Sequence, residues 1–305
     1  ATRTANLSVR PAMPYYTSFD SGFKENGDVE LVSSRNLYAE LAKQSVSASA
    51  SPLVLVDGLS AYLETFPHGC TEQVVSKVFP LVGLMTHPAY MPHVKNVKAH
   101  FSHVIDKLRE RQLSDGGFAF WPGGRRTASY PTIYAMHFLI ESRELGYPVP
   151  ADIIQRGKDY LTSYVGHSTT SLADARDRAN AIYLLTRLGV VTTNYLVDLQ
   201  EQLQKQYNNE WQKDLTASYM AATYQLLQKK DEANHLISGY KLDSSQASKA
   251  DDFHSSLTQD AQHIYLLSKH FENLAKNMSG EELLKLTNKI FKGEYNTISS
   301  AYSIL

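Results

Sequence analysis

The stretch Tyr183-Leu184-Leu185 recurs twice, as Tyr224-Gln225-Leu226-Leu227 and Tyr265-Leu266-Leu267, with the tyrosines 41 residues apart. Thr132–Leu139 is an earlier and looser copy, and Ser300–Leu305 opens a later one. Small residues precede the aromatic side chain in each copy, which lets neighbouring helices approach closely. A repeat of this length predicts structurally equivalent helices that pack side by side.

More polar helices are expected between these copies, because amphipathic segments separate them. An apolar helix that alternates with an amphipathic one indicates helix pairs arranged in series. Closed into a ring, the pairs would form a mainly α protein, an α/α toroid with the apolar helices inside. Periodicity alone leaves an open solenoid as the alternative. The amphipathic segments are Ala151–Val165, Thr193–Tyr207, Asp231–Tyr240 and Gly280–Phe291.

The helical pattern extends upstream to Ser51, a capping residue followed by a proline at a first-turn position. Apolar faces predict helices from there to Phe66, over Thr71–Leu84 and over His93–Gln112. The next segment, Gln112–Gly124, is a loop rich in glycine and aromatic residues. We interpret this loop mainly as structural, because its glycines make tight turns and its aromatic side chains can fill the seam between helix pairs.

Residues 1–50 differ from the rest of the chain, because they show alternation and turn signals. Leu7–Arg10 alternates, and Asn26-Gly27-Asp28 is a turn signal ahead of Val29–Val32. We expect about two to four strands here, too few to close a core alone. The sequence therefore predicts a short β segment, 1–50, followed by a helical domain, 51–305.

The segment Phe66–Gln73, which reads Phe-Pro-His-Gly-Cys-Thr-Glu-Gln, holds the chain's single cysteine. Cys70 and Gln73 stand three residues apart, so their side chains would share one helical turn. If the sulfur attacks the glutamine amide and ammonia leaves, the product is an internal thioester. We expect Gly69 to supply unusual backbone angles and a close approach to Cys70. We also expect the helix that begins here to favour the thiolate.

Two other interpretations of Cys70 stay open on the residues alone. One is a buried free cysteine that packs as a small hydrophobic residue, which leaves the register of Gly69, Glu72 and Gln73 unexplained. The other is a cysteine hydrolase or acyltransferase on an α/α toroid, with a histidine distant in sequence as the base. The chain has 11 histidines, but none stands in a motif typical of such enzymes.

The pattern Gly-Cys-x-Glu-Gln at 69–73 resembles the thioester motif of the alpha-2-macroglobulin and complement superfamily. The wider pattern Pro-x-Gly-Cys-Thr-Glu-Gln is similar to that of the bacterial alpha-2-macroglobulins. This resemblance implies an α/α toroid thioester domain over 51–305. Because the helical repeat stops mid-pattern at Leu305, we expect its C-terminal hairpin to be truncated. The resemblance makes residues 1–50 part of a neighbouring CUB-like β domain. It also implies a periplasmic protease inhibitor for bacterial defence, whose full-length form can be lipid-anchored.

The resemblance further implies a single-turnover covalent trap, and not an enzyme. A target protease cuts a bait region elsewhere in the full protein, and a nucleophile such as a protease lysine then attacks the Gln73 carbonyl. The protease stays linked through Gln73, and Cys70 is released as a thiol. The implied partners are target proteases and the remaining macroglobulin domains of the same chain, and no cofactor is implied.

A thioester must be shielded from water, and Phe66, His68 and Trp121 are the candidates for this cover. Bacterial members of the family carry the pattern Tyr-Pro-Tyr-Gly-Cys-Leu-Glu-Gln. Here Phe66 and His68 replace the tyrosines, and Thr71 replaces the leucine. Phe66 can still cover the bond but has no hydroxyl to donate. Glu72 is expected to orient the ring or to cap the first helical turn.

His167 is a candidate for a second step of acyl transfer. In some complement relatives a histidine far downstream of the cysteine takes the acyl group first and passes it to hydroxyl groups. His167 lies 97 residues after Cys70, near that place, but the local sequence Gly166–Thr170 does not match. We therefore interpret His167 as an exposed loop residue and expect direct transfer to amines.

The composition argues against several other functions. The 30 basic and 31 acidic residues nearly cancel, which gives no support for nucleic-acid binding or electrostatic membrane contact. No apolar run approaches the roughly 18 residues of a membrane span. His100 and His103 lie one turn apart without a further partner at zinc-ligand spacing, so no metal site is predicted. The sequence also lacks a glycine-rich nucleotide motif and the acidic or zinc-binding sets of toroid cyclases and prenyltransferases.

Overall fold

The computed structural model describes residues 28, 30, 46, 54–85, 96–243 and 252–305. The chain divides into two compact units, Ala1–Val46 and Ser47–Leu305, and every helix described belongs to the second. The β segment expected over 1–50 falls almost wholly outside the described residues, as do the helix starts expected at Ser51 and His93. Among the described helices, none is long and apolar enough to cross a lipid bilayer.

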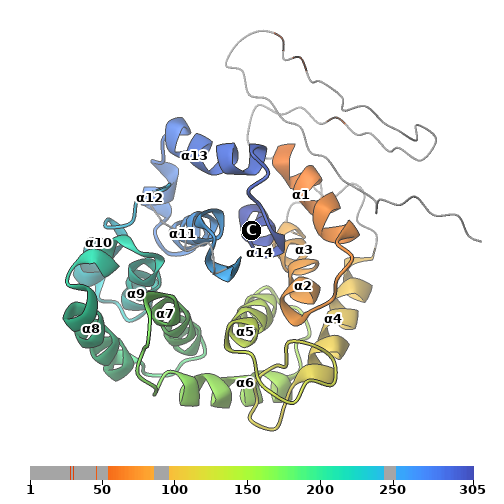
Figure 1. Cartoon of the computed structure of the whole chain (residues 1–305), viewed down its shortest axis with the longest axis horizontal. Coiled ribbons are helices and arrows are strands. Elements are labelled where there is room, and N and C mark those ends of the chain that lie inside the picture. Colours follow the sequence, from red (N-terminus) through yellow and green to blue (C-terminus); the bar gives the residue numbers. More distant parts are fainter. Residues whose placement is uncertain (1–27, 29, 31–45, 47–53, 86–95, 244–251) are drawn as a thin grey trace, which may run out of the picture. The chain divides into compact units, whose positions relative to one another are not determined.

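Six of the described helices form an inner ring in the unit Ser47–Leu305 (Figure 1). Each packs against the next in chain order, and the last packs against the first, so the ring is closed. This contact between the first and last inner helices confirms the α/α toroid and excludes an open solenoid. The inner helices are α2 (Thr71–Ser76), α5 (Ser129–Glu144), α7 (Leu172–Arg187), α9 (Leu215–Leu226), α11 (Ser256–His270) and α14 (Thr297–Ile304).

Amphipathic helices surround this ring and alternate with the inner ones along the chain (Figure 1). Two of them coincide with the amphipathic segments expected from the sequence, Thr193–Tyr207 and Gly280–Phe291. The outer helices are α1 (Val54–Thr65), α4 (Val97–Arg111), α6 (Ala151–Tyr164), α8 (Thr193–Tyr207), α10 (Lys230–Ile237) and α13 (Gly280–Phe291). Shorter elements are α3 (Phe79–Leu84), α12 (Glu272–Lys276), η3 (Glu210–Lys213) and η4 (Asp252–His254).

The inner helices are buried on nearly every side, as the apolar repeat predicts. The repeated tyrosines are not all equivalent, however. Tyr183 and Tyr265 belong to an aromatic cluster around His137 on α5. In α9 it is Tyr219 that packs against Tyr183, whereas the Tyr224 hydroxyl donates a hydrogen bond to Gln200 on the outer helix α8. The sequence repeat therefore marks the helix but not the residue that reaches this cluster.

Polar N-caps start four of the inner helices. In α7, α9, α11 and α14 the side chains of Ser171, Asp214, Ser255 and Asn296 accept a hydrogen bond from a backbone N–H of the first turn. Such caps satisfy donors that the helix itself leaves unpaired. The corresponding N-cap position of α2 is occupied by Cys70. Cys70 thus stands where four of the other inner helices carry an oxygen side chain.

The single helix expected over Thr71–Leu84 is two helices, so this prediction was wrong. α2 ends at Ser76, and α3 begins at Phe79, with Pro80 in its first turn. A proline in the middle of one continuous helix would lack the N–H for the bond to Ser76, and its ring would clash with that carbonyl. The break after Ser76 removes this conflict and leaves α2 as a short helix behind Cys70.

Glycine is required by geometry in the loop Gln112–Gly124, and this gives a prediction. Gly116 has a φ of +89°, and a Cβ built on it would lie 2.0 Å from the carbonyl oxygen of Arg156 on α6. Gly123 also has a positive φ, +72°, but its Cβ would meet nothing within 4 Å. We expect Gly123→Ala to cost about 1 kcal/mol through backbone strain alone. Gly116→Ala should cost about 3 kcal/mol, because strain and the clash add.

Urea unfolding of both variants measures this difference. Gly123→Ala is the matched control, since it carries the same backbone strain without the collision. Equal midpoints for the two variants would show that the contact between the loop and α6 can relax without cost.

Candidate thioester site

Cys70 is almost fully buried, with 2% of its surface exposed, and its backbone is extended as the N-cap of α2. Gln73 lies one turn later, and its side chain folds back over the helix start. The side-chain carbonyl oxygen Oε1 of Gln73 accepts a hydrogen bond of 3.2 Å from the Cys70 backbone N–H. The amide carbonyl that would be attacked therefore lies beside the residue that would attack it.

The thiol of Cys70 is protonated at neutral pH, contrary to the expectation of a thiolate. Burial raises the pKa of Cys70 to about 12, and the carboxyl group of Glu72 adds to this increase. The Sγ atom lies 2.5 Å from Glu72 Oε1. Loss of hydration and a nearby acidic group both disfavour a negative sulfur. In a helix of only six residues, the N-terminal dipole does not compensate.

Glu72 is buried as well, with 5% of its surface exposed. Burial raises the pKa of its carboxyl group, and the contact with Cys70 and the charge of Arg111 work in the opposite direction. One carboxyl oxygen faces the thiol, while Oε2 has no hydrogen-bond partner among the described residues. The side chain is thus aimed at the sulfur of Cys70.

Arg111, at the end of α4, donates hydrogen bonds to the residues on both sides of Cys70. Its Nη2 atom donates to the carbonyl oxygen of Gly69 at 2.8 Å, and its Nη1 atom donates to Oγ1 of Thr71 at 3.1 Å. Arg111 was not among the site residues predicted from the sequence. The available signal was its position three residues after Leu108 on the apolar stripe of α4, where a charged residue needs a specific partner.

The loop Gln112–Gly124 supports the motif from another side. The hydroxyl of Thr71 donates to the carbonyl oxygen of Ala119 at 2.6 Å, and its backbone N–H donates to that of Phe120 at 3.0 Å. Thr71 is fully buried. The loop therefore positions the residue next to Cys70, in addition to the structural role expected for it.

The three candidates for shielding lie in different environments. Phe66 and His68 form an edge-to-face pair with ring centroids 5.6 Å apart, directly before the cysteine. Phe66 is partly buried and His68 is exposed. Trp121 is 48% exposed and packs edge-to-face on Phe120. Of the three, only Phe66 is partly buried, and the shielding role of all three stays a prediction.

Gly69 does not have the backbone feature expected of it. Its φ angle is not positive, and a Cβ built on it would meet no described atom within 4 Å. Neither unusual backbone angles nor a close contact inside this unit requires glycine there. What the residue contributes is open space next to Cys70.

The candidate histidines are not gathered at this site. His167 is exposed, and its ring nitrogen Nδ1 lies 3.4 Å from the carbonyl oxygen of Tyr164. His100 and His103 are exposed on α4. The described part of the chain holds no group of three or more histidine, cysteine or acidic side chains arranged to bind a metal ion.

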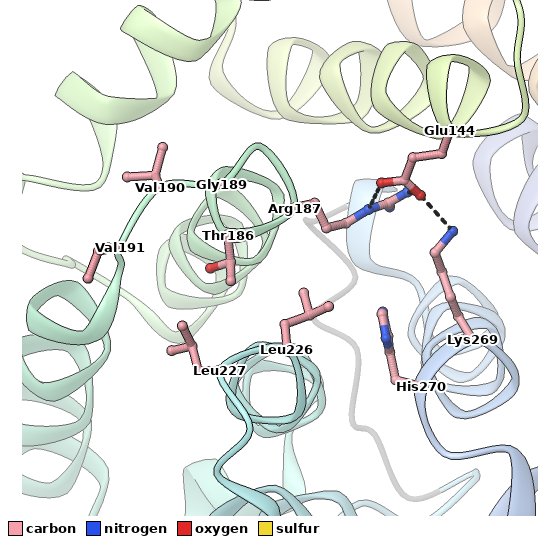
Figure 2. A pocket seen from close by; sticks show the side chains of 10 residues that line it. All are labelled: Glu144, Thr186, Arg187, Gly189, Val190, Val191, Leu226, Leu227, Lys269 and His270. Carbon is pink, nitrogen blue, oxygen red and sulfur yellow. Dashed lines mark hydrogen bonds and ion pairs between the residues drawn. The ribbon is translucent and has the colours of Figure 1, made fainter.

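A cavity of about 380 Å³ lies among the ends of four inner helices (Figure 2). Residues from the C-terminal ends of α5, α7, α9 and α11 line it, among them Glu144, Arg187, Leu226 and Lys269. Contacts of Ser76 with Tyr134, and of Phe79 with Phe138, show that α2 and α3 run in the same direction as α5. The N-terminus of α2 is therefore remote from this cavity, which does not take part in the cysteine site.

Fold and site define a class of protein: an α/α toroid domain with a buried Cys-Thr-Glu-Gln motif at the start of an inner helix. A comparison with protein-family profiles found no match. The chain is 33% identical over 307 residues to the alpha-2-macroglobulin of Rickettsia conorii and 34% identical over 309 residues to an alpha-2-macroglobulin homolog of Yersinia pestis. These alignments cover 99% of the chain in both cases. The chain therefore belongs to the bacterial alpha-2-macroglobulin family.

The chain spans only 16% and 15% of the length of these two relatives. Solved structures agree with the fold. The native alpha-2-macroglobulin of Escherichia coli, from domain MG7 to the C-terminus, matches 82% of this chain with a TM-score of 0.65 at 22% identity and is itself covered to 41%. The Salmonella alpha-2-macroglobulin reacted with methylamine matches the same share with a TM-score of 0.66 at 22% identity and is covered to 17%.

Proposed function

We propose that Cys70 and Gln73 form an internal thioester and that this chain is the thioester domain of a protease trap. In the closing step the sulfur attacks Cδ of Gln73, the carbon–nitrogen bond breaks and ammonia leaves. The observation that supports this most directly is the hydrogen bond of 3.2 Å from the Cys70 N–H to Gln73 Oε1. It holds the amide carbonyl next to the cysteine before any bond forms.

Burial supports the same proposal, because a thioester survives only away from water. Cys70, Thr71 and Glu72 are each no more than 5% exposed. In the trap, an amine of a captured protease attacks the Gln73 carbonyl, which becomes an amide, and Cys70 leaves as a thiol. Each chain reacts once. Capture of a protease requires the rest of the full-length protein, for which we propose a periplasmic location.

A cysteine hydrolase or acyltransferase is the second candidate, and the site gives it less support. Such enzymes pair the sulfur with a basic imidazole that lowers its pKa. In the described residues, the hydrogen-bond partner of the Cys70 thiol is a carboxyl group, and the pKa of the thiol is raised to about 12. This arrangement fits a bond that is formed once and protected better than a nucleophile that turns over.

Methylamine distinguishes the two functions. We expect one methylamine to be incorporated per chain, at Gln73, with release of one thiol that was not titratable before. Peptide mass mapping locates the label, and a thiol reagent counts the cysteine. Cys70→Ala should take up none. Repeated, Cys70-dependent hydrolysis of peptide substrates would instead support the hydrolase.

His167→Ala is the matched variant for the choice of nucleophile. Because His167 is exposed and contacts the Tyr164 carbonyl, we expect the variant to accept methylamine as the unaltered chain does. We expect little uptake of glycerol by either protein. Glycerol incorporation that disappears in His167→Ala would show that the histidine relays the acyl group.

A further inference from the structure

Glu72 makes a contact that neither helix capping nor packing explains. Its Oε1 atom lies 2.5 Å from the sulfur of Cys70, and only 5% of the residue's surface is exposed. Its second oxygen, Oε2, has no hydrogen-bond partner in the part of the chain that the structure describes. Burying a carboxyl oxygen without a hydrogen-bond partner costs stability, so its presence in the folded chain needs an explanation. Here it lies on the group that touches the reactive atom.

Thioester chemistry at this position needs a group that carries a proton. Closing the bond removes the proton from the sulfur of Cys70, and the nitrogen that leaves Gln73 must gain one. Burial and Glu72 raise the pKa of Cys70 to about 12, so only about one thiol in 10⁵ is ionised at pH 7. Attack by a pre-formed thiolate would therefore be rare, and a base in contact with the thiol would increase the rate.

The charged surroundings suit a carboxyl group that can hold or release a proton. Burial raises the pKa of Glu72, while the charge of Arg111 acts to lower it. Arg111 also interacts electrostatically with Cys70 and is held by Gly69 and Thr71. A carboxyl group whose pKa lies closer to neutrality is a better general acid and base than an exposed one. Tyr134 also interacts electrostatically with Glu72. Its hydroxyl forms a hydrogen bond with Ser76, and burial raises its pKa, so it stays neutral.

We propose that Glu72 is the proton carrier of this site, both when the thioester forms and when it opens. The proposal rests on the proposed thioester function. In formation, the carboxylate takes the proton of the Cys70 thiol, the S–C bond to Gln73 Cδ forms, and the protonated carboxyl group passes the proton to the departing nitrogen as the C–N bond breaks. In opening, an amine attacks the same carbon, the C–N bond forms, and its surplus proton travels through Glu72 to the sulfur as the S–C bond breaks.

Glu72→Gln tests this role, because the amide keeps the size and the hydrogen bonding but cannot carry the proton. We expect the rate of ammonia loss after refolding, followed by intact mass, to fall about a hundredfold. Methylamine opening of any bond that forms should slow by a similar factor. Glu72→Asp should recover part of both rates. Glu110→Gln is the matched control, since Glu110 is exposed and bonds Lys107, and it should leave both rates unchanged.

A second measurement separates proton transfer from a structural effect. Iodoacetamide alkylates the thiolate form of a free cysteine. Its rate of reaction with Cys70 can be measured after methylamine has opened the thioester, or in chains in which the thioester never formed. Glu72→Gln removes the carboxylate that disfavours the thiolate, so alkylation at neutral pH should become faster while ammonia loss becomes slower. A purely structural defect would not make alkylation of Cys70 faster and ammonia loss slower at the same time. Wild-type rates of ammonia loss and of methylamine opening in Glu72→Gln would overturn the role of Glu72.

Failure of the underlying function has a different signature. A wild-type chain that never loses ammonia would overturn the thioester, and the role of Glu72 with it. In that case the alkylation profile still reports whether the carboxyl group and the thiol are coupled as the geometry indicates.

Discussion

The freshly purified chain is expected to contain a population one ammonia lighter than its sequence mass, and Cys70→Ala is expected to lack this population entirely. The reason is the closed arrangement at the start of α2, where Gln73 Oε1 already contacts the Cys70 N–H and burial excludes water from the sulfur. Intact-mass spectrometry under denaturing conditions measures the change. The effect is complete, because without the sulfur no ring can form.

Two controls make this result specific. Gln73→Ala removes the leaving amide and should have the full calculated mass, as Cys70→Ala does. Asparagine followed by glycine, as in Asn26-Gly27, can also lose ammonia by cyclisation, and that loss would persist in both variants. A wild-type chain of full mass with a freely titrating thiol would contradict the prediction.

Much of the fold follows from local sequence patterns. The apolar repeat around Tyr183 and Tyr265 predicts the inner helices, and amphipathic segments such as Thr193–Tyr207 predict the outer ones. Closure of the ring does not follow from these patterns. It depends on the packing of α14 against α1 and α2, which are far away in the sequence, so periodicity alone could not separate a toroid from a solenoid. The resemblance of the cysteine motif supplied that choice.

The candidate site, like the fold, could be predicted only in part from the sequence. Spacing along one turn was enough to predict that Cys70 and Gln73 would meet. The supports come from 40 or more residues downstream, as the bonds of Thr71 to Arg111 and Ala119 show. The protonation state was predicted wrongly because burial, which dominates the pKa of the thiol, cannot be read from the motif. Local chemistry was visible in the sequence, whereas the electrostatics depended on tertiary packing.

The far end of the ring contains a buried charge cluster whose loss should strongly destabilise the fold. Glu141 on α5 accepts hydrogen bonds from Tyr265 at 2.5 Å, Lys269 at 2.6 Å and Arg187 at 2.6 Å. Burial alone would raise the pKa of Glu141, but Arg187, His137 and Lys269 lower it from 4.5 to about 2. Arg187 and Lys269 also bond Glu144 at the edge of the cavity (Figure 2).

Glu141→Gln is therefore expected to destabilise the fold by about 3 kcal/mol at pH 7, because it leaves the buried guanidinium of Arg187 and the partly buried ammonium of Lys269 with less compensation. The contribution of Glu141 depends on pH in a defined direction. Its folded pKa is below the unfolded value, so the stabilisation is fully present above about pH 4.5 and is lost as the pH falls towards 2. The difference between the unaltered chain and the variant should shrink over that interval.

Urea unfolding at a series of pH values from 7 downwards measures this difference. Glu144→Gln is the matched control, since Glu144 bonds the same Arg187 and Lys269 but its side chain is 38% exposed. Solvent screening should keep the cost of the control below about 1 kcal/mol. Equal costs for the two variants at pH 7 would show that burial of Glu141 adds nothing to its ion pairs. A cost of Glu141→Gln that stays constant down to pH 3 would show that its pKa is not depressed.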